Sequence, residues 1–138
     1  MRINLEKTAT LPGFTYTDPS NIEHTAYAGQ VDEIYTPTGL NYLKTEEVAD
    51  NIKGYAHLLS PGGKLIIGGV DVYLLAKEVS ARNLTEKEIN TLLFYDPKFT
   101  SLHSLQIIKT IIQSLGMKIN HIYIDKDEVR FTIEAEKI

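Results

Sequence analysis

The segment 58–69 reads LLSPGGKLIIGG and constrains the fold more than any other part of this sequence. Pro61 and the glycines after it predict the end of a helix and a tight turn, because both residue types interrupt regular structure. Residues 64–69 then form a short, continuous apolar run of the kind carried by strands that are buried in parallel sheets. A helix that leads into such a strand is typical of an α/β fold.

Apolar residues at helical spacing predict helices over 45–59, after Asp71, after Thr85 and over 101–116. Thr45, Asp71 and Thr85 have side chains that can accept hydrogen bonds from a first helical turn, so each is expected to cap its helix. Glu88 follows Thr85 by three positions, which completes the pattern of a capping box.

Short apolar runs predict further strands at 3–5, 14–17 and 31–35. In the tail, 129–135 alternates apolar and polar residues, and we expect it to pair antiparallel with 117–124 because the short link DKDE cannot make a parallel crossover. The sequence therefore predicts a three-layer α/β fold, with a mostly parallel sheet and an antiparallel terminal strand, in a single domain over 1–138.

Composition excludes several classes of function. With 138 residues and 43% hydrophobic content the chain suits one compact domain, and a net charge of -4 without dense Lys/Arg stretches argues against a nucleic-acid partner. The absence of cysteine excludes disulfides and thiolate sites, and the scattered histidines show no spacing typical of a metal site. Without an apolar run of membrane or signal-peptide length, we expect a soluble, cytoplasmic protein that has no membrane partner.

Ligands of such sheets bind outside the carboxyl ends of the strands. This rule selects the loops at 5–11, 18–21, 36–39 and 69–71. Asp18 ends the second predicted strand, where its carboxylate could accept hydrogen bonds from both ribose hydroxyls of a nucleoside. A turn that Asp18 caps before Pro19 is the structural alternative.

The motifs VDEIYTPTGLNYL and LLSPGGKLIIGGVDVYLL resemble the central and late motifs of class I S-adenosylmethionine-dependent methyltransferases. The chain is especially similar to small predicted methyltransferases that open with a strand, a glycine turn, LPGF and an aspartate. The resemblance covers nearly the whole chain and implies a Rossmann-like methyltransferase fold with S-adenosylmethionine as cofactor. It implies cofactor-binding roles for Leu5, Glu6, Thr8, Asp18, Thr36 and Pro37.

The first turn departs from the family pattern. Glu6, Lys7 and Thr8 stand where relatives have glycines that let the backbone approach the ligand. A second departure follows the third strand, where Asn41 and Tyr42 replace the acidic residue and the histidine of many relatives. No catalytic residue is assigned.

Two functions remain open at this point. The chain is either a methyltransferase that acts on a small-molecule or glycan-like acceptor, or a catalytically inactive binding or assembly module with the same fold. Methyl transfer mainly requires that the reacting atoms be held in line, so the lack of an evident base excludes neither function. A homodimer through the terminal strands is a further expectation.

Overall fold

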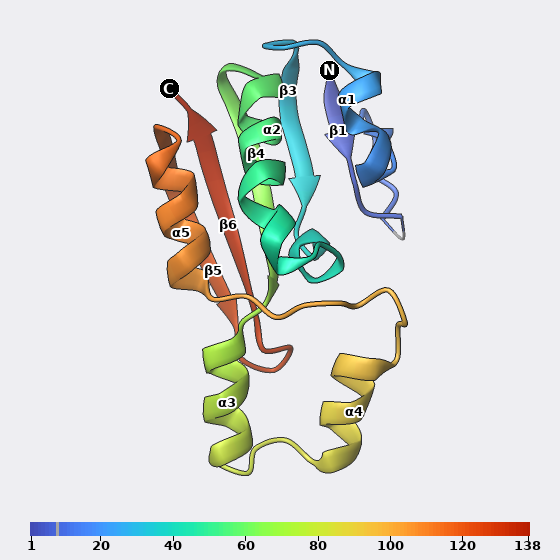
Figure 1. Cartoon of the computed structure of the whole chain (residues 1–138), viewed down its shortest axis with the longest axis vertical. Coiled ribbons are helices and arrows are strands. Elements are labelled where there is room, and N and C mark those ends of the chain that lie inside the picture. Colours follow the sequence, from blue (N-terminus) through green and yellow to red (C-terminus); the bar gives the residue numbers. More distant parts are fainter. Residues whose placement is uncertain (8) are drawn as a thin grey trace.

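The computed structural model describes residues 1–7 and 9–138, which form a six-stranded sheet with helices (Figure 1). The strands are β1 (Arg2–Asn4), β2 (Thr15–Tyr16), β3 (Val31–Thr36), β4 (Leu59–Val70), β5 (Met117–Asp125) and β6 (Arg130–Lys137). The α-helices are α1 (Ile22–Thr25), α2 (Val48–Leu58), α3 (Val72–Ser80), α4 (Glu86–Phe94) and α5 (Leu105–Ser114). Short 3-10 helices are η1 (Pro19–Asn21), η2 (Gly39–Tyr42) and η3 (Thr45–Glu47).

The strand order is β2-β1-β3-β4-β6-β5. Strands β2, β1, β3 and β4 pair parallel, whereas β6 pairs antiparallel with both β4 and β5. The predicted α/β class, the mostly parallel sheet and the antiparallel terminal hairpin are therefore confirmed. The antiparallel strand β6 lies one position in from the edge, because β5 occupies the edge itself.

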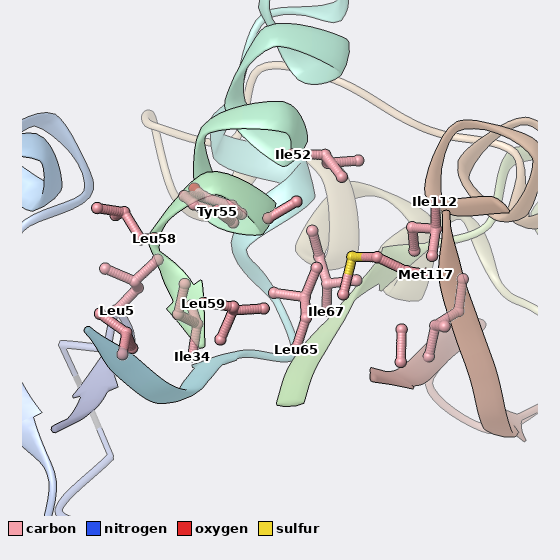
Figure 2. Packing of buried hydrophobic residues seen from close by; sticks show 14 of the residues in the cluster. Leu5, Ile34, Ile52, Tyr55, Leu58, Leu59, Leu65, Ile67, Ile112 and Met117 are labelled. Atoms are coloured by element: carbon pink, nitrogen blue, oxygen red, sulfur yellow. The ribbon is translucent and has the colours of Figure 1, made fainter. Parts of the chain in front are cut away.

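The main hydrophobic core lies on one face of this sheet. Helices α1, α2 and α5 contribute side chains to the same buried cluster as the strands, and Figure 2 shows Ile52 and Tyr55 of α2 and Ile112 of α5 around Leu65 and Ile67 of β4. On the other face, alternate strand residues are half-buried and largely polar, and they include Glu33, Tyr35, Thr132 and Glu134. The three described helices of the main core thus cover one face of the sheet.

The predicted helix caps are confirmed where the side chain of the capping residue reaches the first helical turn. Oδ1 of Asp71 accepts from Tyr73 N and Leu74 N, and the capping box of Thr85 and Glu88 is formed as predicted. The prediction for Thr45 is wrong, because residues 45–47 form the separate helix η3 and α2 begins at Val48 without a side-chain cap.

Two element boundaries also differ from the prediction. The turn at 60–63 lies inside β4, which pairs with β3 at Leu59 and again from Lys64 onward across an irregular step. Helix α5 begins at Leu105 instead of 101, since Ser104 is its cap and His103 forms an isolated bridge with Asp71. No described helix is long and apolar enough to cross a membrane.

A second, smaller core lies below the sheet in Figure 1, between α3, α4 and the β5–β6 hairpin. Its buried residues are Val70, Leu75 and Val129, and partly buried side chains such as Leu84, Leu92 and Phe99 pack against them. Because β4 ends and β6 begins at this edge, the helical arm formed by α3 and α4 covers the carboxyl end of β4.

Candidate functional site

The loops after β1, β2 and β3 start side by side. Strand β1 lies between β2 and β3, and all three run parallel, so their carboxyl ends reach the same edge of the sheet. Pairing continues beyond the strands, since Leu5 N donates to Tyr35 O and Thr17 N donates to Asn4 O, both at 3.0 Å. This edge is the place where ligands of α/β sheets bind.

Asn4 shapes the first loop. This side chain is only 2% exposed, and its Nδ2 donates to Ala9 O at 2.8 Å while its Oδ1 accepts from Glu6 N at 2.8 Å. Ala9 N also donates to Glu6 O, so the backbone turns back on itself over Asn4. Sequence analysis missed Asn4, although an amide inside an apolar strand was a signal. Thr8, a predicted site residue, lies outside the described residues.

Glu6 connects the first loop to the loop after β3. Its carboxylate accepts hydrogen bonds from the backbone N of Thr38 at 2.6 Å and from the Thr38 hydroxyl at 2.7 Å. Burial, together with the negative charge of Glu6, raises the pKa of Tyr55 to about 12. The structure therefore places the carboxylate of Glu6 between two of the predicted ligand loops.

Other predicted site residues lie around this connection. Leu5 and Thr36 are buried, with 5% and 2% of their surface exposed, and Pro37 is half-buried. Leu5 belongs to the main core, so its side chain supports the first loop from below. Thr36 and Pro37 directly precede Thr38, whose two donors hold Glu6.

Asp18 has an exposed carboxylate at the end of β2. Its Oδ1 accepts from Ser20 N at 2.9 Å and from the Ser20 hydroxyl at 2.6 Å, so Asp18 caps η1. These hydrogen bonds hold the pKa of Asp18 below its ordinary value. Oδ2 has no hydrogen bond to a described residue, which leaves it accessible to a ligand.

The second departure from the family pattern has a structural explanation. Asn41 is 1% exposed, and its side chain joins the end of β4 to a distant segment by accepting from Val70 N and donating to Ser101 O. A Cβ at Gly69 would lie only 2.8 Å from Asn41 Oδ1, so glycine is required there. Tyr42 donates its hydroxyl hydrogen to Asp96. Both side chains thus make contacts within the protein.

His103 was not singled out by the sequence but is part of this buried polar network. Its Nε2 lies 2.7 Å from Leu40 O and 2.7 Å from the hydroxyl of Ser101. Because a carbonyl oxygen only accepts, Nε2 carries the hydrogen. Burial lowers the pKa of His103, and the hydrogen bond to Leu40 O opposes this shift in part. The His103 ring joins η2 to the segment before α5.

A cavity of about 740 Å³ lies between α4 and the β5–β6 turn. Its lining includes Tyr42 at the end of η2, Tyr95 and Phe99 after α4, and Arg130 at the start of β6. None of the predicted cofactor-binding residues lines it. Among the described residues no cluster of three metal-ligating side chains occurs.

No protein-family model matches the sequence, and no curated protein is significantly similar to it. Solved structures are similar in fold. An S-adenosylmethionine-dependent methyltransferase from Mesorhizobium loti aligns over 98% of this chain and 78% of its own, with 14% identity and a TM-score of 0.65. One from Archaeoglobus fulgidus aligns over 90% of this chain and 67% of its own, with 12% identity and a TM-score of 0.60.

Magnesium protoporphyrin IX methyltransferase from Synechocystis PCC 6803, solved with bound S-adenosylhomocysteine, aligns over 91% of this chain with 17% identity and a TM-score of 0.60. This chain spans only 51% of the length of that enzyme. At such low identity the likeness concerns the fold. The chain has the Rossmann-like fold of the class I S-adenosylmethionine-dependent methyltransferases.

Proposed function

We propose that this chain binds S-adenosylmethionine at the carboxyl ends of β2, β1 and β3 and transfers its methyl group to a small-molecule or glycan-like acceptor. The observation that carries the proposal is the pair of carboxylates at this edge, Asp18 after β2 and Glu6 after β1. Asp18 can accept hydrogen bonds from the ribose hydroxyls, and Glu6 can accept them from the ammonium group of the methionine part. The cofactor, when bound, supplies a methyl group on a positively charged sulfur.

The residues of the chain fit this assignment in three respects. Oδ2 of Asp18 is free of hydrogen bonds to described residues, so it can accept from the ribose without breaking the cap of η1. The carboxylate of Glu6 is held in place by Thr38, so little ordering is needed when an ammonium group arrives. Leu5 and Thr36 lie at the ends of β1 and β3 next to these loops, Pro37 follows Thr36, and Thr8 follows Glu6 by two positions in the sequence.

The second candidate function is a catalytically inactive module, and the same contact of Glu6 with Thr38 favours it. Glu6 stands where relatives have a glycine, and its side chain closes the gap between the loops after β1 and β3. If this gap is where the methionine part must lie, the carboxylate excludes it. The two functions therefore predict opposite effects of removing the Glu6 side chain.

Calorimetric titration with S-adenosylmethionine and S-adenosylhomocysteine separates the two functions. We expect the native chain to bind, Glu6→Gln to bind about tenfold more weakly because a charge-assisted hydrogen bond is lost, and Asp18→Ala to lose a similar factor. Glu46→Gln, at an exposed carboxylate before α2, is the matched control and should bind like the native chain.

Other outcomes decide against the first function. Binding that appears only in Glu6→Gly would show that Glu6 obstructs the site, and the inactive module would then be correct. Native binding that survives Asp18→Ala unchanged would contradict the ribose assignment. Absence of binding in the native chain and in Glu6→Gly would exclude the cofactor.

A further inference from the structure

The edge formed by the loops after β1, β2 and β3 has few hydrogen-bond donors left for a ligand. Backbone N–H groups of the first loop already have acceptors within the protein, namely those of Leu5, Glu6 and Ala9. In the loop after β3, the backbone N–H and the hydroxyl of Thr38 both donate to the carboxylate of Glu6. A ligand anion needs such donors, and at this edge they are directed to protein acceptors instead.

The same edge is rich in acceptors. Oδ2 of Asp18 accepts from no described residue. Each carboxylate oxygen of Glu6 accepts one hydrogen bond from Thr38, and a carboxylate oxygen can accept two. Glu6 is half-buried and forms no ion pair with a described residue. Within the described part of the chain, the negative charge of Glu6 is therefore not compensated by a cation.

Two lysines near this edge act on Asp18. The pKa of Asp18 is lowered chiefly by its hydrogen bonds with Ser20, and in smaller part by the charges of Lys98 and Lys7. Both lysine side chains are exposed, so water and salt screen their charges. These lysines are thus poorly suited to neutralise a second carboxylate beside Glu6.

This arrangement restricts the methionine part of the ligand. S-adenosylmethionine carries its ammonium and its carboxylate on one carbon atom. If Glu6 accepts from the ammonium, one hydrogen bond and two covalent bonds place the ligand carboxylate within about 6 Å of the Glu6 carboxylate. Like charges at this distance repel. A ligand that keeps the amine and lacks the carboxylate retains the attraction without the repulsion.

We propose that this edge prefers an S-adenosyl sulfonium compound whose side chain ends in an amine without a carboxylate, and that it binds this compound more tightly than S-adenosylmethionine. Glu6 accepts from the amine, and Asp18 accepts from the ribose hydroxyls. The carboxylate of Glu6 takes up the two donors of Thr38 that a ligand carboxylate would need. The inference rests on the proposed function, since it uses the same edge and the same two carboxylates.

The test is a calorimetric titration of the native chain at about 50 mM salt with two ligands that differ only in the carboxylate, S-adenosylmethionine and its decarboxylated form. We expect the decarboxylated form to bind about tenfold more tightly. Glu6→Gln removes the charge, so it should weaken binding of S-adenosylmethionine about tenfold and of the decarboxylated form about a hundredfold, which makes the two affinities similar. Glu46→Gln, at an exposed carboxylate before α2, is the matched control and should keep the native ratio.

The outcomes separate this inference from the proposed function. If the native chain binds S-adenosylmethionine as tightly as the decarboxylated form, or more tightly, the inference is overturned and the proposed function is kept. A native ratio that persists in Glu6→Gln also overturns it, because the preference would then have another cause. The ratio is measured on the native chain, so it decides even if Glu6→Gln unfolds. If neither ligand binds the native chain, the proposed function and this inference both fail.

Discussion

At the scale of single residues, His103 shows how burial couples charge to stability. The ring is 6% exposed, so burial disfavours its charged form, and the hydrogen bond from Nε2 to Leu40 O offsets this effect only in part. Burial holds the pKa of His103 below the ordinary value of 6.5. In the window between the folded pKa and 6.5 the unfolded chain binds more protons than the folded chain, so the free energy of unfolding falls as the pH falls.

We therefore expect the contribution of His103 to be complete above pH 6.5 and to be lost as the pH falls through the folded pKa. His103→Gln keeps a donor near Leu40 O but does not titrate, so its unfolding free energy should fall less than that of the native chain as the pH is lowered from about 7.5 to 5.5. Urea unfolding at several pH values measures this difference. His121→Gln, on the exposed part of β5, should follow the native chain, and parallel curves for native and His103→Gln would contradict the prediction.

At the scale of elements, the α3–α4 arm and the sheet differ in how much they bury. Helix α4 contains no buried residue, and α3 buries only Leu75, whereas α2 buries five residues against the sheet. Segments with few buried apolar side chains open locally at low free energy. The arm should therefore open more readily than the sheet and its covering helices.

Amide hydrogen exchange tests this difference directly. We expect the amides of α4 to exchange at least about tenfold faster than those of α2, because local opening of α4 exposes little apolar surface. Helix α2 is the internal control, since it is of similar length and packs on the main core. Equal protection of both helices would show that the arm opens only with the whole molecule.

The elements that the sequence predicted well are those with local causes. Thr85 and Glu88 lie three positions apart, so their mutual hydrogen bonds need only the helix that they cap. The hairpin followed from a short linker and an alternating strand. The prediction that Thr45 caps a helix was wrong because residues 45–47 form η3. Whether η3 forms depends on how the loop after β3 packs.

Part of the candidate site could also be predicted, because its position follows from the arrangement of neighbouring strands. The edge where the loops meet follows from parallel strands, and the sequence identified Glu6 and Asp18 there. The contact of Glu6 with Thr38 spans 32 positions, and Arg130 meets the cavity only through the packing of α4 on the hairpin. Such contacts depend on tertiary structure, so no spacing in the sequence indicates them.

At the scale of the whole molecule, the sheet ends in a strand that could pair further. β5 is an edge strand, and Ile122, Tyr123 and Ile124 are 37%, 56% and 57% exposed. An exposed edge strand with apolar side chains can pair with another chain. The part of β5 before His121 contains a bulge, so residues 121–125 form its regular edge.

This segment is complementary to itself, and we expect it to form a homodimer. If two copies pair antiparallel with Tyr123 opposite Tyr123, Ile122 lies opposite Ile124 on one face and His121 lies opposite Asp125 on the other. Each chain then covers the exposed isoleucines of its partner. Ile122→Lys places a charge opposite an apolar side chain and should yield monomers.

Light scattering after size exclusion measures the mass of the assembly. We expect the native chain to approach twice the mass of one chain at about 100 µM, because pairing of the two edge strands buries the exposed isoleucines. Tyr27→Lys, at an 83% exposed aromatic before β3, is the control and should remain dimeric. A native chain that is monomeric at this concentration would exclude the dimer. A dimer that survives Ile122→Lys would place the interface elsewhere.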